Sequence, residues 1–492
     1  MRQFTWIGLM MLLALTVRAH ELDQPIVRFH PTRHYRSAVI ARACYYDHAP
    51  DVPDWARKVA DANRTMQQAG EPPLMEWVAC GAYLALGHEN IMIPRALAVL
   101  IWVGGAIPLW LLTMRLGSPS GAAVAAALYL FLPYGIIASQ NFQPDPLMTV
   151  ASLWAILALV RYSDDRRGAR FLTAMSLVAA AGLIKPMSVF LTIPALAAIE
   201  YARKEPLKTR AATALELMFV GLLVPVIFYG YSAVKGTLVQ DQMRMRFEPQ
   251  LIPTMFFWGG LGRMVSRVET WPLLLLAVAG AIVATDRMAR WLLAGLFAGY
   301  FAFAVVFTYH MPTHDYYHLP YIPVVALGVG VLLARIESVA LFSSPRIRAA
   351  ATALLCVVTI AIGTAVAWPR MRLENAAIFQ QIYEEIGTLA QHDTRALFLD
   401  TEYGFAMMYH GQISGDSWPN QDDLAAEAID GRPAIDADAR FVRDYADWAP
   451  DYFIVTDLAS LKASPDLQAM LAKRAIPVRL TDRYQVYRFK ND

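Results

Sequence analysis

The sequence predicts a polytopic α-helical membrane protein with about eleven transmembrane helices and a small C-terminal α/β soluble domain. Of its 492 residues, 57% are hydrophobic and only 17% are charged, which is too apolar for a soluble protein of ordinary design. Apolar runs of membrane-spanning character recur as far as residue 367. From Trp368 onward, short helix and strand patterns alternate instead, as in a layered α/β domain.

The chain begins with an apolar run at residues 4–17. Its length also suits a signal peptide, but Arg18 lies between the two small residues of the cleavage signal, which favours a retained first span. Residues 20–90 form a polar first loop that we expect outside the membrane. Within it, residues 74–87 are apolar but too short for a span, which predicts a helix on the membrane surface.

The remaining spans follow from the other apolar runs. They are expected at residues 91–116, 122–139, 147–162, 171–184, 186–201, 213–233, 272–284, 291–308, 319–334 and 349–367. The run 171–201 could be one tilted helix or two short ones, because Lys185-Pro186 interrupts its middle.

Two short basic loops decide between these alternatives. Residues 161–170 and 203–210 each contain several arginines or lysines, and the positive-inside rule places both loops in the cytoplasm. The run 171–201 therefore crosses twice, with Lys185 on the outer side. Each half is only about 15 residues, roughly 22 Å of helix, so we expect the turn to lie below the membrane surface. Counting spans from these two cytoplasmic loops toward each end of the chain gives a cytoplasmic N-terminus and an external tail.

The tail, residues 369–492, is predicted to be a periplasmic α/β domain with a structural or recognition role, because it has no glycine-rich phosphate loop and no triad pattern. Its expected helices are 375–391, 437–445 and 465–474, and its expected strands are 396–399, 452–455, 478–480 and 484–488. Among the three cysteines, a bridge between Cys44 and Cys80 is geometrically possible, whereas Cys356 lies in an apolar run.

A polar interruption, Gln140-Asn141-Phe142-Gln143-Pro144-Asp145-Pro146, separates two apolar runs. Its two prolines prevent a continuous helix and hold Asp145 where the chain leaves lipid. Asp145 is therefore a candidate site residue. The alternative is that Asp145 only caps the helix that follows.

Further ionisable residues fall on the same outer side in the predicted topology. Several cations with a few carboxylates suit a phosphate-bearing lipid, because arginine binds phosphate through two N–H groups and lysine acts as a point charge. The candidate phosphate ligands are Arg33, Arg36, Lys185, Arg244, Arg246, Tyr316 and His318. We expect His34, Gln143, His314, Asp315 and Tyr317 to line a substrate pocket.

Most of these candidates have a structural alternative. Arg33 and Arg36 could hold ordinary lipid headgroups, and Lys185 could serve only to end a helix. Arg244 and Arg246 suit a solvated face. The formal net charge of +2, spread over many loops, excludes nucleic acid as an expected partner.

The aromatic and histidine cluster at residues 309–318 has alternatives of its own. It could form an interfacial belt. His310, His314 and His318 recur every four residues, but Pro312 breaks the helix that would align them for a metal. We therefore predict no metal and no cofactor, although a divalent cation would be compatible.

Four motifs, in this order, resemble the GT-C superfamily of polyprenyl-phosphate-sugar-dependent glycosyltransferases, which includes protein O-mannosyltransferases and the lipid A aminoarabinose transferase. The motifs are Glu71-Pro72-Pro73-Leu74, Phe142-Gln143-Pro144-Asp145-Pro146, Lys185-Pro186 and His314-Asp315-Tyr316-Tyr317-His318-Leu319-Pro320. The resemblance covers residues 1–368 and implies a GT-C-like catalytic domain there, including the first external loop. It further implies a sugar donor on undecaprenyl or dolichyl phosphate and transfer with inversion.

One departure from the superfamily concerns the general base. Members usually carry Asp near the start of the first external loop, where this sequence reads Phe29-His30-Pro31-Thr32-Arg33-His34-Tyr35. The common His-Pro-Pro-Leu element begins here with Glu71 instead of His, which places a carboxylate nearby. Either Glu71 or Asp145 serves as the general base in place of the missing Asp, or the protein has lost transferase activity. We prefer Glu71 as the base and Asp145 as a substrate contact.

The predicted function is a glycosyltransferase for cell envelope glycans in the bacterial inner membrane. It moves a hexosyl or pentosyl group from a polyprenyl-phosphate donor to a hydroxyl of a lipid, glycan or protein acceptor on the periplasmic side. A transporter or flippase for a lipid-linked sugar would more often show an inverted repeat, and the sequence has none. A non-catalytic scaffold that presents the tail is a third alternative.

Overall fold

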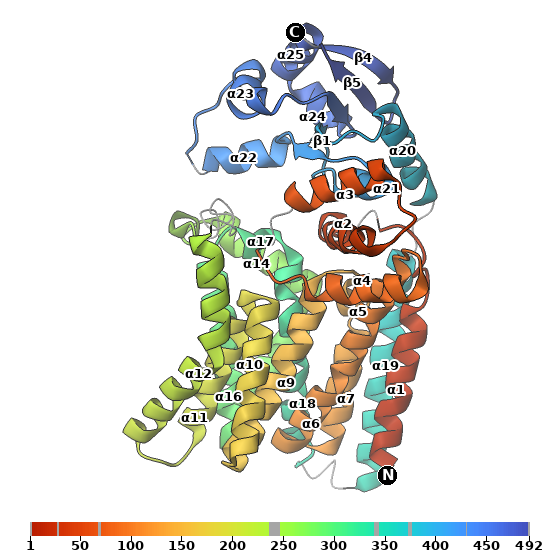
Figure 1. Ribbon diagram of the computed structural model, residues 1–492. Coiled ribbons are helices and arrows are strands. Elements are labelled where there is room, and N and C mark those ends of the chain that lie inside the picture. The colour runs from red at the N-terminus through yellow and green to blue at the C-terminus, as the bar shows by residue number, and fades with distance from the viewer. Residues whose placement is uncertain are drawn as a thin grey trace. The chain divides into compact units, whose positions relative to one another are not determined.

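The computed structural model describes residues 2–26, 29–66, 70–235, 247–338, 344–371, 376–429 and 431–490. The chain divides into two compact units (Figure 1). The first, which we call the helical bundle, comprises Met1–Leu22, Ala69–Pro72 and Arg95–Arg372. The second, the α/β unit, comprises Asp23–Gln68, Pro73–Pro94 and Leu373–Asp492.

The helical bundle is built from helices throughout. In chain order they are α1 (Arg2–Arg18), α5 (Met92–Gly104), α6 (Ala106–Leu116), α7 (Pro119–Phe131), α8 (Pro133–Ala138), α9 (Pro144–Asp164), α10 (Gly168–Ile184), η1 (Pro186–Ser188), α11 (Val189–Ala202), α12 (Leu207–Val234), η2 (Pro249–Leu251), α14 (Met255–Val268), α15 (Trp271–Val283), α16 (Arg287–Val306), α17 (His310–Thr313), η3 (Asp315–Tyr321), α18 (Ile322–Ile336) and α19 (Pro345–Met371).

Each expected span coincides with helical residues. Among the described residues, six helices are long and apolar enough to cross a membrane, or seven if α14 and α15, which bend by 91°, count as one span. Other expected spans consist of shorter apolar helices, because breaks such as Pro133 and Lys185-Pro186 divide them. The polytopic helical membrane fold is thus confirmed.

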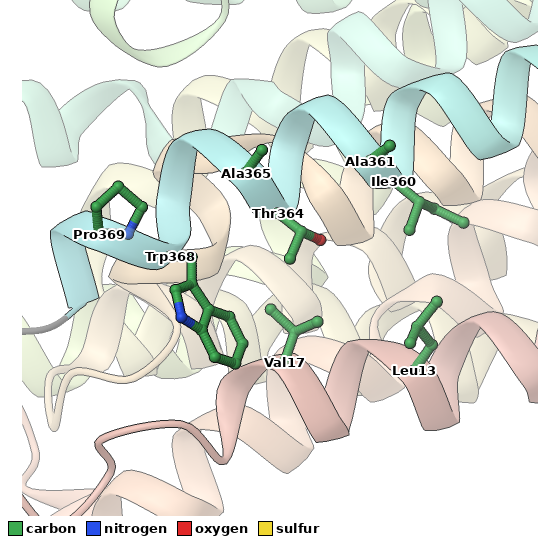
Figure 2. Close-up of a pocket in the computed structure, with 8 residues that line it drawn as sticks. All are labelled: Leu13, Val17, Ile360, Ala361, Thr364, Ala365, Trp368 and Pro369. Atoms are coloured by element: carbon green, nitrogen blue, oxygen red, sulfur yellow. The ribbon is translucent and has the colours of Figure 1, made fainter.

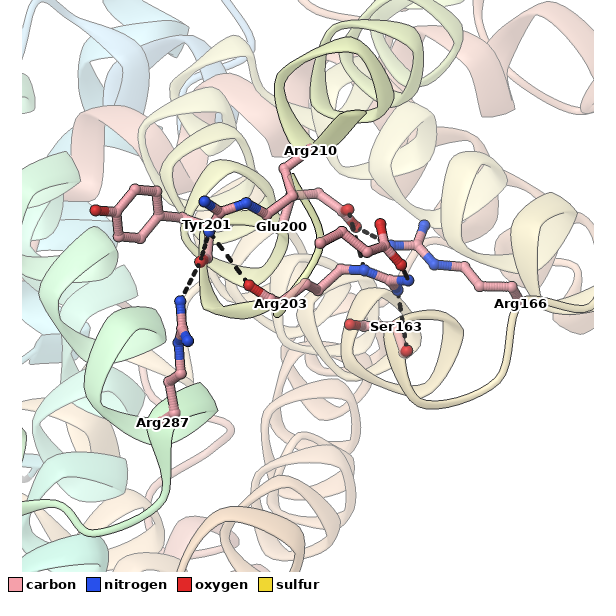
Figure 3. A network of polar contacts seen from close by, with 8 residues as sticks. Ser163, Arg166, Glu200, Tyr201, Arg203, Arg210 and Arg287 are labelled. Carbon is pink, nitrogen blue, oxygen red and sulfur yellow. Dashed lines mark hydrogen bonds and ion pairs between the residues drawn. The ribbon is translucent and has the colours of Figure 1, made fainter. Parts of the chain in front are cut away.

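Side chains of the two basic loops, including Arg166 and Arg203, meet in one network of polar contacts (Figure 3). Arg166 forms an ion pair with Glu200 at the end of α11, and Arg203 Nη1 donates a hydrogen bond to the Ser163 carbonyl at 3.2 Å. Contact between residues 166 and 200 requires the chain to reverse between α10 and α11. The structure therefore has the hairpin expected for residues 171–201, and its turn is at Lys185.

An apolar groove of about 500 Å³ runs between α1 and α19 (Figure 2). Its lining residues are Leu13, Val17, Ile360, Ala361, Thr364, Ala365, Trp368 and Pro369. Beyond the C-terminal end of α1, the His20 ring stacks on Trp368 with centroids 3.8 Å apart. The first and last long helices of the bundle are therefore neighbours.

The α/β unit combines part of the first loop with the tail. Its elements are α2 (Pro31–His48), α3 (Asp54–Met66), α4 (Leu74–Leu86), α20 (Ala376–Leu389), β1 (Ala396–Leu399), α21 (Phe405–His410), β2 (Gly415–Ser417), α22 (Gln421–Ile429), α23 (Ala437–Asp444), η5 (Ala446–Trp448), β3 (Tyr452–Val455), α24 (Leu458–Ala463), α25 (Pro465–Arg474), β4 (Ala475–Leu480) and β5 (Gln485–Phe489).

The five-stranded sheet has the order β2-β1-β3-β5-β4. β1 pairs in parallel with β2 and β3, and β5 pairs antiparallel with β3 and β4. The four predicted strands are present, but β4 begins earlier than expected because an edge strand tolerates Pro477. Strand β2 was not predicted, because it is only three residues long and lacks an apolar alternation.

The expected boundary, which grouped the first loop with residues 1–368, differs from the packing observed. Arg42 of α2 pairs with Glu89 at 2.8 Å and donates to the Tyr409 carbonyl of α21 at 2.5 Å. His410 also forms a 2.9 Å hydrogen bond with the Tyr35 hydroxyl. Most of the first loop therefore packs with the tail, because polar groups far apart in sequence complete each other's hydrogen bonds.

Helix α4 has one buried and one exposed side. A disulfide joins Cys80 of α4 to Cys44 of α2, as the sequence allowed. On the buried side, Glu76 accepts a 2.6 Å hydrogen bond from the Ser37 hydroxyl. On the exposed side, Trp77 is 56% exposed. The helix itself was predicted correctly, and its place on the membrane surface stays a prediction.

Candidate active site

The centre of the candidate site is a buried ion pair in the helical bundle. Asp145 lies in the first turn of α9, and Lys185 follows the last residue of α10. Because these helices pack together as an antiparallel pair, the start of one meets the end of the other. The Lys185 ammonium donates to Asp145 Oδ1 at 2.7 Å, and the two side chains are 1% and 2% exposed.

The capping alternative for Asp145 is not what the structure shows. No side-chain hydrogen bond caps the start of α9. Within the described part of the chain, Asp145 Oδ2 is buried and accepts no hydrogen bond. In the same part of the structure, the side-chain oxygen and nitrogen of Gln143, two residues earlier, are also buried without a hydrogen-bond partner. Buried polar atoms without partners are rare in folded proteins, so this corner of the bundle has the capacity to bind a polar ligand.

Two tyrosines complete the surroundings of Lys185. Its ammonium lies 5.5 Å from the ring centroid of Tyr316 and 5.7 Å from that of Tyr317, distances typical of cation–π contact. Both tyrosines belong to the buried helix η3. The bundle thus brings together three of the stretches singled out in the sequence, which carry Asp145, Lys185 and residues 314–318.

A second carboxylate–cation pair lies in the same motif. Asp315, 3% exposed, accepts a hydrogen bond from the Tyr134 hydroxyl at 2.7 Å and forms an ion pair with Arg267, whose Nε lies 2.9 Å from Asp315 Oδ2. The Arg267 side chain is 61% exposed. Tyr134 also interacts electrostatically with Asp145, which links the two pairs. Neither Tyr134 nor Arg267 was among the residues predicted from the sequence.

The signals that could have identified these two residues are modest. Tyr134 follows Pro133, at the helix break that leads into the Asp145 stretch. Arg267 lies in the last turn of α14, a helix with polar and apolar sides. Neither residue differs from its neighbours in the sequence, and only the contacts of Asp315 with both of them identify them as site residues.

His318 does not have the geometry expected of a phosphate ligand. It is fully buried, its Nδ1 lies 2.5 Å from the Tyr300 hydroxyl, and its Nε2 lies 2.8 Å from the Met311 carbonyl. The buried Glu269 carboxylate is 3.8 Å from Nδ1. Because both ring nitrogens are occupied, His318 holds η3 in place instead. His314 is half-buried, with Nδ1 2.7 Å from the Thr313 hydroxyl.

Glu71 belongs to the bundle and is half-buried. It interacts electrostatically with Tyr229, whose hydroxyl donates to the Leu183 carbonyl at 2.9 Å. Leu183 is two residues before Lys185, so Glu71 lies toward the end of the bundle where the Asp145–Lys185 pair is found.

Three other candidates lie in the α/β unit. Arg33, His34 and Arg36 occupy the first two turns of α2, where His34 is buried and both arginines are half-buried. The start of α2 is held by the tail, because the Thr32 N–H and hydroxyl both donate to the Glu402 carboxylate. Burial raises the pKa of Glu402. The candidates Arg244 and Arg246 lie outside the described residues.

The three-histidine metal alternative is not formed. The rings of His310 and His314 are 5.2 Å apart, but both nitrogens of His318 contact other groups. In the described part of the chain, no group of three or more His, Cys, Asp or Glu side chains is placed to hold a metal ion. The absence of a cofactor stays a prediction.

Comparison with known sequences gives one family match. Residues 70–229 match the family described as dolichyl-phosphate-mannose-protein mannosyltransferase. The matched segment contains Glu71, Asp145 and Lys185. No curated protein sequence matches the chain.

Comparison with solved structures gives matches over nearly the whole chain. The apo structure of ArnT from Cupriavidus metallidurans has a TM-score of 0.64 and 15% identity, covering 99% of this chain and 98% of ArnT. The same protein bound to undecaprenyl phosphate has a TM-score of 0.59 and 16% identity, covering 98% of both chains. The oligosaccharyltransferase AglB from Archaeoglobus fulgidus, in complex with an inhibitory peptide and a dolichol-phosphate, has a TM-score of 0.61 and 11% identity, covering 96% of this chain and 72% of AglB.

The fold is therefore that of the GT-C membrane glycosyltransferases. The family match adds that residues 70–229, the segment that contains the buried ion pair, resemble the dolichyl-phosphate-mannose-protein mannosyltransferase family.

Proposed function

We propose that this protein transfers a sugar from a polyprenyl-phosphate donor to an acceptor hydroxyl on the periplasmic side of a bacterial inner membrane. The observation that carries the proposal is the buried Asp145–Lys185 pair with its neighbour Asp315–Arg267. Ionisable groups within an apolar helical bundle are costly and by default mark a functional site. The undecaprenyl phosphate and dolichol-phosphate bound to the ArnT and AglB structures support a lipid-linked donor.

In this proposal the cations bind the donor phosphate. The phosphate gains negative charge as the glycosidic bond breaks, and fixed positive charges lower the energy of that transition state. Lys185 is positioned as a buried point charge, while the exposed guanidinium of Arg267 has donors available for phosphate. Asp145 and Asp315 orient these cations in the absence of donor. Arg33 and Arg36 stay proposed as further phosphate ligands.

The acceptor hydroxyl must lose its proton as its oxygen attacks the anomeric carbon from the face opposite the phosphate, which inverts that centre. A carboxylate within about 3 Å of that oxygen serves as general base. We keep Glu71 for this role. Asp145 has one oxygen committed to Lys185, and its other oxygen is directed to substrate in our proposal.

The proposed orientation rests on the two ends of α9. Asp145 is in its first turn, whereas the loop with Arg166 follows its last residue, about 30 Å away for a helix of this length. Basic loops favour the cytoplasm, so the ion pair and the tail belong to the periplasmic side and the N-terminus to the cytoplasm.

Cysteines replacing Arg167 and Pro206 should resist a membrane-impermeant reagent in intact cells, and one replacing Gln421 should react. The opposite labelling would reverse the orientation.

Purified protein in detergent tests the activity directly. With a radiolabelled polyprenyl-phosphate sugar and an acceptor extract, we expect sugar transfer and stoichiometric release of polyprenyl phosphate, and no release by a folded Lys185→Met variant. Unchanged donor that moves across the bilayer of proteoliposomes would identify a flippase instead. Unchanged donor without movement would identify a scaffold. Mass spectrometry of copurified lipids would identify the donor class and its sugar.

A further inference from the structure

Arg18, the last residue of α1, is completely buried. Its Nε donates to the Ser139 hydroxyl at 2.7 Å, and its Nη2 donates to the Leu130 carbonyl at 2.7 Å. Among the described residues it forms no ion pair with a carboxylate. A buried guanidinium without a counter-charge is costly, so its position calls for a specific role.

The acceptors of Arg18 belong to a helix break. Pro133 follows the end of α7 and cannot donate a backbone hydrogen bond, so carbonyls of the last turn of α7 lose their helical partners. The Leu130 carbonyl is one of these. Ser139 is the C-cap residue of α8 and directly precedes the stretch that leads to Asp145. Arg18 therefore joins the two sides of the break.

A second set of hydrogen bonds ties the same stretch to the chain beyond α1. Gln140 Nε2 donates to the carbonyls of Arg18 at 2.8 Å and His20 at 3.0 Å. Arg95 Nε donates to the Gln140 carbonyl at 3.1 Å, and its Nη1 donates to the Leu22 carbonyl. Residues 18–22 and 139–140 are thus held together by the side chains of Arg18, Gln140 and Arg95, the last from α5.

We propose that Arg18 is a positioning residue that, through Ser139 and Gln140, holds residues 139–143 and thereby Asp145 in place. It follows that α1 is a permanent part of the mature protein and not a cleaved signal peptide. The catalytic part of this inference rests on the proposed function. Positioning of Asp145 would raise the rate because groups that are already held in place when substrate arrives do not lose conformational entropy during the reaction.

The mature N-terminus gives the first test. Intact mass of protein purified from membranes, with N-terminal sequencing, should show a chain that retains α1. A mature chain that begins after Arg18 would overturn the proposal. This measurement does not depend on any transferase activity.

Hydrogen exchange of the full-length protein gives the second test. Ser139→Ala removes an acceptor of Arg18 with little change in volume, and Arg18→Lys keeps the charge but not the fork of N–H groups. We expect both variants to raise amide exchange in residues 139–143 by about tenfold, with unchanged exchange in the tail. Arg346→Gln, an exposed arginine on α19, is the matched control. Wild-type exchange at 139–143 in both variants would overturn the proposal, even if no transfer is detected for the wild type.

Kinetics separate positioning from a merely structural role. If Asp145 is displaced, kcat should fall on the order of a hundredfold, while the KM for donor rises by less than kcat falls, because Lys185 loses its orienting partner but the Asp315–Arg267 pair is intact. A loss of donor affinity with unchanged kcat, or faster exchange with unchanged kinetics, would contradict a positioning role for Arg18.

Discussion

The Lys185 ammonium lies 2.7 Å from Asp145 Oδ1, and both side chains are buried. Breaking a buried pair leaves an uncompensated charge and typically costs about 3–5 kcal/mol. We expect Lys185→Met to lower both stability and transfer, and the double variant Lys185→Met/Asp145→Asn to regain much of the stability without regaining transfer. Thermal unfolding and turnover measured together test this. A double variant with near wild-type turnover would exclude the pair from the reaction.

The choice of base is tested by two isosteric changes. Glu71→Gln and Asp145→Asn keep shape and remove charge. With donor saturated, we expect Glu71→Gln to lower turnover by about 10²–10⁴-fold, the usual contribution of a general base. Full turnover in Glu71→Gln with none in Asp145→Asn would exchange the two roles. Activity in both would mean that neither is the base.

Arg267 and Arg263 offer a matched comparison, since both are exposed arginines of α14 and Arg267 pairs with Asp315. We expect Arg267→Gln to raise the KM for donor and lower kcat/KM by roughly tenfold to a hundredfold, because charged hydrogen bonds contribute about 1.5–3 kcal/mol. Arg263→Gln should be close to wild type. Equal effects of the two changes would indicate a general charge effect.

His410 gives a pH dependence to the α/β unit. Burial, with a smaller effect of Arg42, lowers the pKa of His410 to about 3. As pH falls below about 6.5, the unfolded chain takes up a proton that the folded unit does not, so stability is lost progressively between pH 6.5 and about 3. We expect the free energy of unfolding of the wild type to fall more steeply with decreasing pH over this range than that of His410→Gln. Parallel curves would show that His410 is not responsible.

Glu402 holds the start of α2 from the tail, by accepting from Thr32. The N-cap residue His30 has no side-chain capping hydrogen bond, so Glu402 performs this function. We expect Glu402→Ala to cost about 0.5–2 kcal/mol, the usual range for a lost cap, with faster amide exchange in the first turn of α2. Glu384→Ala, exposed on α20, is the control. Unchanged exchange at residues 32–36 would refute the capping role.

Several features of the bundle could be predicted because they are local in sequence. Apolar length and proline breaks are properties of one segment, and they located the spans, the turn at Lys185 and the proline-flanked position of Asp145 at the start of a helix. The basic loops 161–170 and 203–210 correctly predicted the hairpin between them. The four strands β1, β3, β4 and β5 were equally predictable, whereas the short edge strand β2 was not.

The site partners were less predictable, since they depend on which side chains face each other. Nothing local distinguishes Arg267 from Arg263, and only the fold shows that Asp315 contacts Arg267 and Tyr134. Histidine is a residue type that can bind phosphate, yet both ring nitrogens of His318 form hydrogen bonds, one with the Tyr300 hydroxyl and one with the Met311 carbonyl.

The sequence by itself determined the class of protein, the order of the spans and the stretches that carry Asp145 and Lys185, because hydropathy and helix breaks act over a few neighbouring residues. The tertiary structure alone decided that the first loop packs with the tail, through contacts such as Arg42 with Tyr409. It also decided that Arg18 is joined to the Asp145 stretch. Hydrogen bonds and ion pairs between distant residues depend on distance in space, which a pattern along the chain does not encode.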